Sequence, residues 1–508
     1  MSNYRSNVQE ATSGEAISCT LAGNRQKIEA LFADSFDLAI LDWHFGPQLQ
    51  YAAFSVYFDT LIQHKKVNYM RESLQDLIPH ELGQGTEVTP EDIARFYNAQ
   101  GVSSQSATLI QDFNSAVDSV LSGSLVIFFE GWDKALAFQA SNLEGRQITE
   151  PVSEPVVQGP RESTVESLSK NIGLLRTRVR TTRFKLKRIV CGDNLQNEVV
   201  YGYIEDRVEP KVLEQFESRI QGIEKVDILD VSYLEDWIEE SSISPFPQCR
   251  FTERPDAAAA NLMEGKIAVL ANGSPTILLC PAVFVEFVTN SEDYYQRTVH
   301  ASMIRILRII AFVMALVLPS TYIAFSTFHP ELLPSVLLLA ILETREGIPF
   351  PAFVEALIME FFFELLREAG IRLPRPVGSA VSIVGALVIG QAAIQAKIAS
   401  PIMVIIVALT GIASFSIPQY SMAIALRILR FPLMVLATTL GGFGMLVGFL
   451  LILLHLTKLK ALGIPYLSGL APLNTVLFRD VVVRRRIKKL IQSNRKAAKS
   501  GISKGDQP

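Results

Sequence analysis

The chain has 508 residues, of which 49% are hydrophobic and 19% charged, and its mean hydropathy of +0.26 exceeds that of an ordinary soluble enzyme. A formal net charge of -4 provides no overall basic field, so nucleic acid is not expected as a partner. The four cysteines form neither a C-x-x-C pair nor a His-flanked cluster, which argues against a zinc site and against a disulfide framework.

The first 300 residues are predicted to form a cytoplasmic region. Residues 1–25 are polar, lack the apolar core of a signal peptide, and are expected to be a disordered leader. Residues 26–160 mix short apolar runs with amphipathic stretches, which favours a first α/β subdomain. Its end falls in a proline-rich run from Glu150 to Glu162 that excludes regular structure.

Residues 161–300 are predicted to form a second α/β subdomain. The expected elements are an amphipathic helix over 163–187, strands over 198–204 and 226–231, and helices over 210–223 and 233–239. The clearest local pattern is a pair of apolar runs that flank Asn272-Gly273 between residues 266 and 280. Because Asn-Gly accepts positive φ, this pattern predicts a β-hairpin with a tight turn.

Residues 301–457 are predicted to form a transmembrane helical domain. The apolar segments are 309–328, 332–342, 350–366, 377–396, 402–417 and 431–456. Segment 332–342 is too short to span a bilayer and is interrupted by charges, so it is expected to be re-entrant or interfacial. The predicted fold class is therefore an α+β cytoplasmic region of two subdomains followed by an α-helical polytopic membrane domain.

Arginines and lysines near the span ends predict the topology. Groups of them precede the first long segment, follow Leu366 and follow Thr457, which places all three sites and both termini in the cytoplasm. Two cytoplasmic termini require an even number of crossings, although the long segments number five. We expect about four spans, with part of 377–417 peripheral or re-entrant. Residues 458–508 form a basic cytoplasmic tail, whose run Arg484–Lys489 is expected to bind anionic membrane lipid.

No catalytic signature is present. The sequence lacks the P-loop, Rossmann, H-E-x-x-H and G-x-S-x-G patterns, and its six histidines are scattered. The chain is therefore expected not to be an enzyme, and no cofactor or metal is predicted.

The most informative segment is a helix that combines apolar and acidic residues. At 100° per residue, five side chains fall on one stripe of this helix: Phe353, Leu357, Glu360, Glu364 and Glu368. Glu355 lies on the opposite side. A carboxylate facing lipid is costly, so within a membrane this stripe should face water or protein, and in a ring of subunits it would line a cation pore. The alternative is an interfacial amphipathic helix whose charges pair locally, and the sequence leaves the two readings about equally weighted.

Small and polar residues mark two further helices. Gly444 and Gly448 are spaced for close helix packing. Gln391 and Gln395, one turn apart, either line a polar path or bond a neighbouring helix, and the second is favoured.

Several motifs occur in the order found in one known family. They are Glu150–Glu162 with Glu166–Asn171, Phe246–Gln248, Thr252–Asp256, Glu264–Leu270, Pro349–Pro351, Glu355–Glu360, Glu364–Gly370 with Arg372–Pro374, and Gly385–Ala393. Over residues 36–472 the chain resembles the A subunits of GerA-type spore germinant receptors. It departs from the family pattern at Gln158, where arginine is usual, and at Ser163 and Thr164, where Gly-Phe is common.

The resemblance implies a role in spore germination. It implies a subunit of a nutrient receptor in the inner membrane of the spore, which works with a multi-span B subunit that holds the nutrient site and with a C lipoprotein. It also implies self-association, as a pentamer, into a ligand-gated cation channel. Two alternatives stay open: a non-conducting scaffold subunit, and a GerA-like paralogue that amplifies ion release without sensing a nutrient.

Overall fold

The computed structural model contains two compact units, one built on β-sheets and one on helices. The first unit consists of residues 1–155, 160–238 and 251–280, and the second of residues 156–159, 239–250 and 281–508. The structure describes residues 15–45, 49–72, 89–98, 107–141, 151, 154–373, 375–471 and 482–484.

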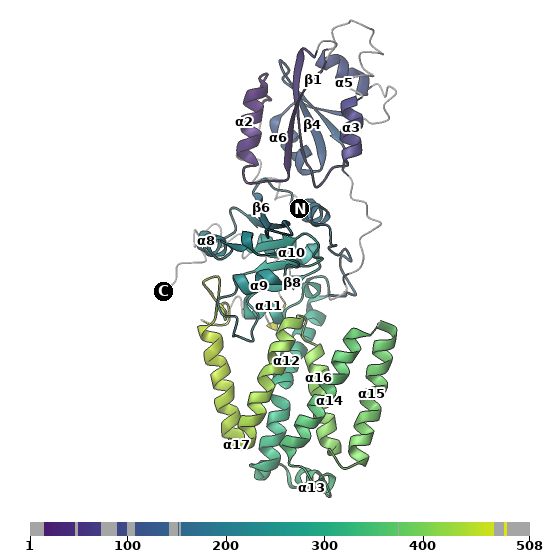
Figure 1. The fold of residues 1–508 in the computed structure, drawn as a ribbon, viewed down its shortest axis with the longest axis vertical. Coiled ribbons are helices and arrows are strands. Elements are labelled where there is room, and N and C mark those ends of the chain that lie inside the picture. Colours follow the sequence, from purple (N-terminus) through teal and green to yellow (C-terminus); the bar gives the residue numbers. More distant parts are fainter. Residues whose placement is uncertain are drawn as a thin grey trace. The chain divides into compact units, whose positions relative to one another are not determined.

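The first sheet of the first unit has the order β1-β2-β4-β5-β3, and its neighbouring strands are antiparallel. Its elements are β1 (Leu38–Phe45), β2 (Tyr51–Phe58), β3 (Ala107–Ile110), β4 (Ser124–Phe129), β5 (Ala135–Gln139), α2 (Leu21–Leu31), α3 (His64–Glu72), α5 (Pro90–Asn98) and α6 (Phe113–Leu121). One apolar cluster joins a sheet face to α3 and α5, and another joins the opposite face to α2 and α6 (Figure 1). Because both faces are covered, β4 is apolar from Leu125 to Phe129.

The second sheet has the order β6-β7-β9-β10-β8. Its elements are α7 (Leu168–Arg178), β6 (Phe184–Cys191), β7 (Asn197–Ile204), α8 (Pro210–Arg219), η2 (Ile223–Lys225), α9 (Tyr233–Ile238), β8 (Arg250–Thr252), α10 (Pro255–Met263), β9 (Ile267–Ala271) and β10 (Ile277–Cys280). Apolar residues of α7 and α10 form one core cluster with β6, β7, β9 and β10. Two sheets with their own helices confirm the predicted α+β region of two subdomains.

The predicted hairpin and its Asn-Gly turn are both present, although the connection between the strands is longer than the turn itself. Strands β9 and β10 are antiparallel, with Leu278 opposite Val269, and five residues connect them. The Asn272 N–H donates to Glu198 O at 2.9 Å, and the Gly273 N–H donates to Glu166 O at 2.8 Å. Gly273 has φ +84°, as the Asn-Gly pattern requires. The Ser274 N–H donates to Ala271 O at 3.2 Å, so a tight turn closes around Asn272-Gly273 as predicted, and the turn's own N–H groups also bond neighbouring segments.

Some of the other predicted helices and strands are confirmed and others are wrong. Strand β7 and helices α8 and α9 confirm three of the expected elements. The helix expected over 163–187 is wrong at both ends, because α7 begins at Leu168 and ends at Arg178, and β6 begins at Phe184. The β-branched Val179, Thr181 and Thr182, which lie between α7 and β6, disfavour a helix. No strand forms over 226–231. Helix α2 begins at Leu21, so the expected loose leader does not extend to residue 25.

A buried ion pair connects the two subdomains within the first unit. Arg176 of α7 donates from Nε to Asp37 Oδ2 at 3.0 Å and from Nη2 to Asp37 Oδ1 at 2.7 Å. Its third nitrogen, Nη1, donates to Phe184 O at 2.8 Å. The guanidinium lies 4.3 Å from the ring centroid of Phe58 and 4.9 Å from that of Phe184. Each nitrogen of this cation donates to a fixed partner, which explains how it tolerates burial.

The second unit is a helical bundle. Its elements are α11 (Phe284–Val288), η3 (Ser291–Tyr294), α12 (Thr298–Thr327), η4 (Pro330–Leu332), α13 (Ser335–Thr344), α14 (Ala352–Arg372), α15 (Arg375–Gln395), α16 (Pro401–Phe415), α17 (Tyr420–Lys458), β11 (Lys460–Ala461) and β12 (Ile464–Pro465). Among the described residues, α12 and α17 are long and apolar enough to cross a membrane. The ten-residue α13 covers the segment that was expected to be too short to span.

Helix α17 is a hairpin of two arms rather than one helix. Gly441 has φ +61° and ψ -141°, which interrupts the helix between arms 420–440 and 442–458. A Cβ placed on Gly444 would lie 2.1 Å from Leu436 O, and one on Gly448 would lie 2.6 Å from Leu433 Cδ2. The two arms therefore pack against each other through these glycines, and the chain reverses at the lower end of α17 in Figure 1. The prediction of one continuous segment over 431–456 is wrong.

Contacts between helices fix their directions. The guanidinium of Arg430 bonds Ala315 O, and Gly441 meets Phe328, so α12 runs parallel to the first arm of α17. Likewise Glu355 bonds the Ser400 N–H, and Gly411 meets Phe363, so α14 runs parallel to α16. Short connections make α14, α15 and α16 successive antiparallel neighbours. Counting each arm of α17 separately, the long helices alternate in direction along the chain.

Residues 239–250 belong to the helical unit although they precede all its helices in sequence. The Tyr466 hydroxyl donates to Pro247 O at 2.7 Å, and the Gly463 N–H donates to Glu240 Oε1 at 3.0 Å. Ser244 Oγ lies 2.8 Å from His455 Nε2 in a third hydrogen bond. Phe246 is buried beside His455 and Tyr466. This segment is therefore fixed on the end of α17 and on the β11–β12 hairpin.

Gly441→Ala should destabilise the helical unit by about 2 kcal/mol or more, because an alanine pays for positive φ and its Cβ would lie 2.8 Å from Phe328. The measurement is the thermal midpoint of the purified protein in detergent. Gly442→Ala is the matched control, since its nearest atoms, on His329, lie at 3.3 Å and its φ is not positive. Equal midpoints for the two variants would contradict this account of the hairpin.

Candidate functional site

The acidic segment forms α14, whose carboxylates occupy different environments. The helix begins after Pro351, and Ala, Leu, Met, Glu and Arg, which favour helices, fill most of it. Glu355 and Glu360 are buried, whereas the side chains of Glu364 and Glu368 are 48% and 52% exposed. The two carboxylates in the first half of α14 therefore lie in the protein interior, and the two in its second half lie at the surface.

Glu360 forms a buried ion pair with Arg430 in the first arm of α17. Its Oε2 accepts from Arg430 Nη1 at 2.6 Å, and Arg430 Nε donates to Ala315 O of α12 at 2.8 Å. The two side chains are 5% and 3% exposed. Arg430 is ten residues from either end of its arm, which corresponds to roughly 15 Å at 1.5 Å per residue. The pair thus connects three helices near the middle of the bundle.

The two outer carboxylates pair with three arginines, of which Arg372 is exposed and Arg367 and Arg427 are largely buried. Glu364 contacts Arg367 of its own helix and lies 3.5 Å from Arg427 Nη1, while Glu368 lies 2.6 Å from Arg372 Nη2. Arg427 also lies over the ring of Tyr420, 5.6 Å from its centroid. The pairs with Arg367 and Arg372 lie within α14, as the interfacial alternative expected, whereas Arg427 belongs to α17.

Glu355 anchors the other end of α14. Its Oε2 accepts from the Ser400 N–H at 2.9 Å, at the N-terminus of α16, where a carboxylate is favoured by the helix dipole. Its Oε1 lies 3.2 Å from Arg345 Nη2, beyond the end of α13. Glu355 therefore ties α13, α14 and α16 together.

The predicted stripe is thus divided between two surroundings. Phe353 and Leu357 are half-buried and pack against the apolar cluster of α12, α14, α16 and α17, and Glu360 is buried. Only Glu364 and Glu368 are exposed. Sequence reasoning missed the arginine partners Arg427 and Arg430, although their signal was available: both interrupt an otherwise apolar stretch.

The two glutamines of α15 do not bond a neighbouring helix within the described chain. Gln391 and Gln395 are exposed, while Gly390 and Ala393 on the opposite side are buried. No hydrogen bond joins either amide to another described residue. The favoured reading, an amide bonded to a neighbouring helix, has no partner in this part of the protomer.

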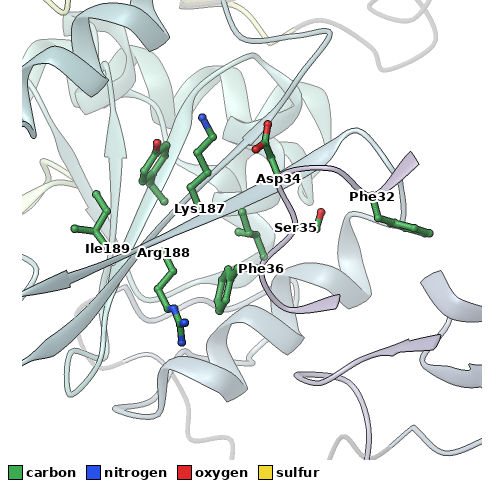
Figure 2. A pocket seen from close by; sticks show the side chains of 9 residues that line it. Phe32, Asp34, Ser35, Phe36, Lys187, Arg188 and Ile189 are labelled. Atoms are coloured by element: carbon green, nitrogen blue, oxygen red, sulfur yellow. The ribbon is translucent and has the colours of Figure 1, made fainter. Parts of the chain in front are cut away.

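The first unit carries a surface hollow of about 460 Å³ beside β6, lined by Phe32, Asp34, Ser35, Phe36, Leu186, Lys187, Arg188, Ile189 and Tyr201. Figure 2 shows Lys187 and Asp34 on one side of β6 and Arg188 and Phe36 on the other. Lys187 Nζ and the Tyr201 hydroxyl each lie 2.9 Å from Glu217 Oε1, and Arg188 pairs with Glu198. Lys187 and Arg188 of the hollow are therefore already engaged.

Lys187, Tyr201 and Glu217 form a hydrogen-bonded trio whose members shift one another's pKa. Burial alone raises the pKa of Glu217, but hydrogen bonds from Lys187 and Tyr201 outweigh it and lower the pKa overall. Burial raises the pKa of Tyr201, and its bond to Glu217 raises it further. The trio is therefore held in one charge state over the neutral range. Among the described residues, no group of three or more His, Cys, Asp or Glu side chains is placed to hold a metal ion.

Comparisons with known proteins agree on one family. The model of the Bacillus/Clostridium GerA spore germination protein matches residues 26–496. An uncharacterized membrane protein, YfkQ of Bacillus subtilis (strain 168), is 40% identical over 92% of this chain and 89% of its own length. Spore germination protein KA of the same organism is 39% identical over 94% of this chain and 86% of its own.

One further relative and one solved structure are also similar to this chain. Spore germination protein A1 of Bacillus subtilis (strain 168) is 38% identical over 75% of this chain and 79% of its own length. The crystal structure of the N-terminal domain of the A subunit of the Bacillus megaterium spore germinant receptor GerK3 aligns with 54% of this chain and 99% of its own, with 22% identity and a TM-score of 0.42. On the family match and the first relatives, this chain belongs to the GerA family of spore germination proteins.

Proposed function

We propose that the chain is the A subunit of a nutrient germinant receptor in the spore inner membrane, and that copies of it assemble into a ligand-gated cation channel. Family membership supports the first part. The observation that carries the second is that Glu364 and Glu368 are half exposed on a helix of the apolar bundle. Lipid does not solvate a carboxylate, so this face must meet water or protein.

In this proposal the bundle crosses the membrane six times. The alternating directions of α12, α14, α15, α16 and the two arms of α17 give an even number of crossings, which supports both ends on one side. The arginines near the start of α12 then assign that side to the cytoplasm. The hairpin at Gly441 divides one of the five long apolar segments into two crossings, which makes the number even. We therefore propose six crossings in place of the four that the sequence led us to expect.

The pore face in this proposal is the outer half of the acidic stripe. Glu364 and Glu368 would form two carboxylate rings in an oligomer, and Glu364 lies one turn, about 6 Å, from the central Glu360–Arg430 layer. Phe353, Leu357 and Glu360 would support this face from inside each protomer. The multi-span B subunit and the C lipoprotein remain the proposed partners, and a pentamer the proposed assembly.

A non-conducting subunit is the second candidate, and one observation favours it. The four carboxylates of α14 contact five arginines: Arg345, Arg367, Arg372, Arg427 and Arg430. A charge-balanced network attracts cations less than bare carboxylate rings do. The likeness to an uncharacterized membrane protein is equally compatible with an amplifying paralogue.

Glu364→Gln separates the candidates. It removes one negative charge per subunit and leaves Arg367 and Arg427 without their counter-charge, so the local field becomes positive. Cation flux through the protein in liposomes, opened by the receptor's activating conditions, should fall severalfold. Glu331→Gln, at an exposed carboxylate outside the stripe, is the control and should leave the flux unchanged. Normal flux through a well-folded Glu364→Gln protein would remove the pore assignment, and absence of flux in every variant would favour the non-conducting candidate.

A further inference from the structure

We infer that residues 156–159 form a strap that transmits movement of the first unit to α12, the first long helix of the bundle. This inference rests on the proposed function, because it concerns how opening is triggered. The strap lies in the proline-rich run that joins the two subdomains, yet it belongs to the helical unit, whereas residues up to 155 and from 160 belong to the first unit. The chain therefore enters the helical unit here for four residues and then returns.

A single carboxylate holds the strap on η3. Glu292 Oε1 accepts from the Val157 N–H at 3.1 Å and from the Gln158 N–H at 3.2 Å. Gly159 has φ +120°, and a Cβ at this position would lie 2.8 Å from Tyr295 Cδ2, directly after η3. The Val157 side chain is 81% exposed, so the attachment depends on these backbone contacts rather than on a buried apolar side chain.

Both ends of the linker are held in the first unit by two adjacent residues. Glu154 Oε2 accepts from Thr252 Oγ1 at 2.6 Å, and the Thr164 N–H donates to Glu253 O at 2.8 Å. A proline on each side of the strap restricts the backbone there. A loop that is fixed at both ends and stiffened by proline has little slack, so a displacement of its ends pulls on its middle.

Helix η3 is in turn bound to the start of α12. Asp293 Oδ2 accepts from Arg305 Nε at 2.9 Å and from Arg308 Nη1 at 2.8 Å. The side chains of Asp293 and Arg305 are 2% and 1% exposed, and a buried ion pair is costly to break, so η3 and the first turns of α12 move together. Farther along α12, Ala315 O accepts from Arg430 of the buried pair with Glu360. Contacts within the helical unit therefore connect the strap to the middle of the bundle.

Limited proteolysis of the purified full-length protein in detergent tests the attachment. Glu292→Ala removes the acceptor of both strap bonds, so trypsin should cleave after Arg161 roughly three- to tenfold faster than in the wild type. Glu331→Ala, at an exposed carboxylate of the helical unit, is the control and should be cleaved there at the wild-type rate. An unchanged rate in Glu292→Ala would overturn the inference.

Lengthening the linker separates transmission from attachment. Insertion of Gly-Ser-Gly-Ser between Pro155 and Val156 keeps Glu292 and its two bonds but adds slack. At equal protein abundance, spores whose only copy of this chain is lengthened should lose turbidity in rich nutrient broth roughly three- to tenfold more slowly than wild-type spores. The same insertion between Asp133 and Lys134, in the connection between β4 and β5, is the control and should leave the rate unchanged. Equal rates for lengthened and wild-type spores would overturn the inference.

Failure of this inference is distinguishable from failure of the proposed function. If the wild-type protein conducts cations in liposomes and the lengthened chain slows nothing, the channel stands and the strap does not. If the wild-type protein passes no cations while the lengthened chain still slows the response of spores, the strap stands and the channel does not.

Discussion

Arg430→Met should destabilise the helical unit by about 3–5 kcal/mol, because it leaves the Glu360 carboxylate buried without its counter-charge. The thermal midpoint in detergent should fall sharply, with a loss of folded protein. The control is Arg372→Met, whose pair with Glu368 is 78% and 52% exposed and should contribute less than about 1 kcal/mol. Equal stability of the two variants would show that the buried pair is not a fixed part of the fold.

The double replacement Glu360→Leu with Arg430→Met separates folding from function. It removes both charges and fills the site with apolar groups, so most of the lost stability should return. If cation flux returns as well, the pair serves only to join α12, α14 and α17. If stability returns and flux does not, the charge pair itself takes part in opening the protein.

Asp37→Ala should have a similarly large effect in the first unit. It leaves Arg176 buried, with two of its nitrogens deprived of their acceptor, and should cost about 3–5 kcal/mol. Unfolding of the full-length protein in urea, followed by proteolysis of the β-sheet region, measures this effect. The matched control is Asp42→Ala, which breaks the exposed pair with Arg25 and should cost less than about 1 kcal/mol.

The order of proteolysis carries further information. Because Asp37 lies at the start of β1 and Arg176 lies in α7, loss of the pair should loosen the junction before either sheet unfolds. New cleavage sites should therefore appear first between the two subdomains. Simultaneous cleavage throughout both sheets would mean that the pair stabilises the unit as a whole.

The sequence predicted those structural features that depend on residues close together in the chain. Asn272-Gly273 between two apolar runs predicted the β9–β10 hairpin, and apolar spacing predicted most of the helices. The partition into a charged first region and an apolar second region predicted the two structural classes. For the hairpin and the helices, the determining residues are close neighbours in the sequence, and the partition depends only on composition.

Features that depend on distant residues were not readable in this way. Arg176 and Asp37 are 139 positions apart, and Arg430 and Glu360 are 70 positions apart, so no periodicity connects them. The reversal at Gly441 was missed for another reason: a glycine-rich run in an apolar stretch fits both a packing motif within one helix and a turn between two. Its conformation, with φ +61°, decides for the turn.

The assignment of residues 239–250 to the helical unit has a consequence during synthesis. Glu240, Ser244 and Pro247 leave the ribosome before any membrane helix, yet their partners Gly463, His455 and Tyr466 follow 211 to 223 positions later. At about 5–20 residues per second, this segment waits roughly 10–45 seconds for its partners. His455 and Tyr466, which lie beside the ring of Phe246, are missing throughout that interval, so a chaperone or the membrane surface has time to engage the nascent chain before the C-terminal arm arrives.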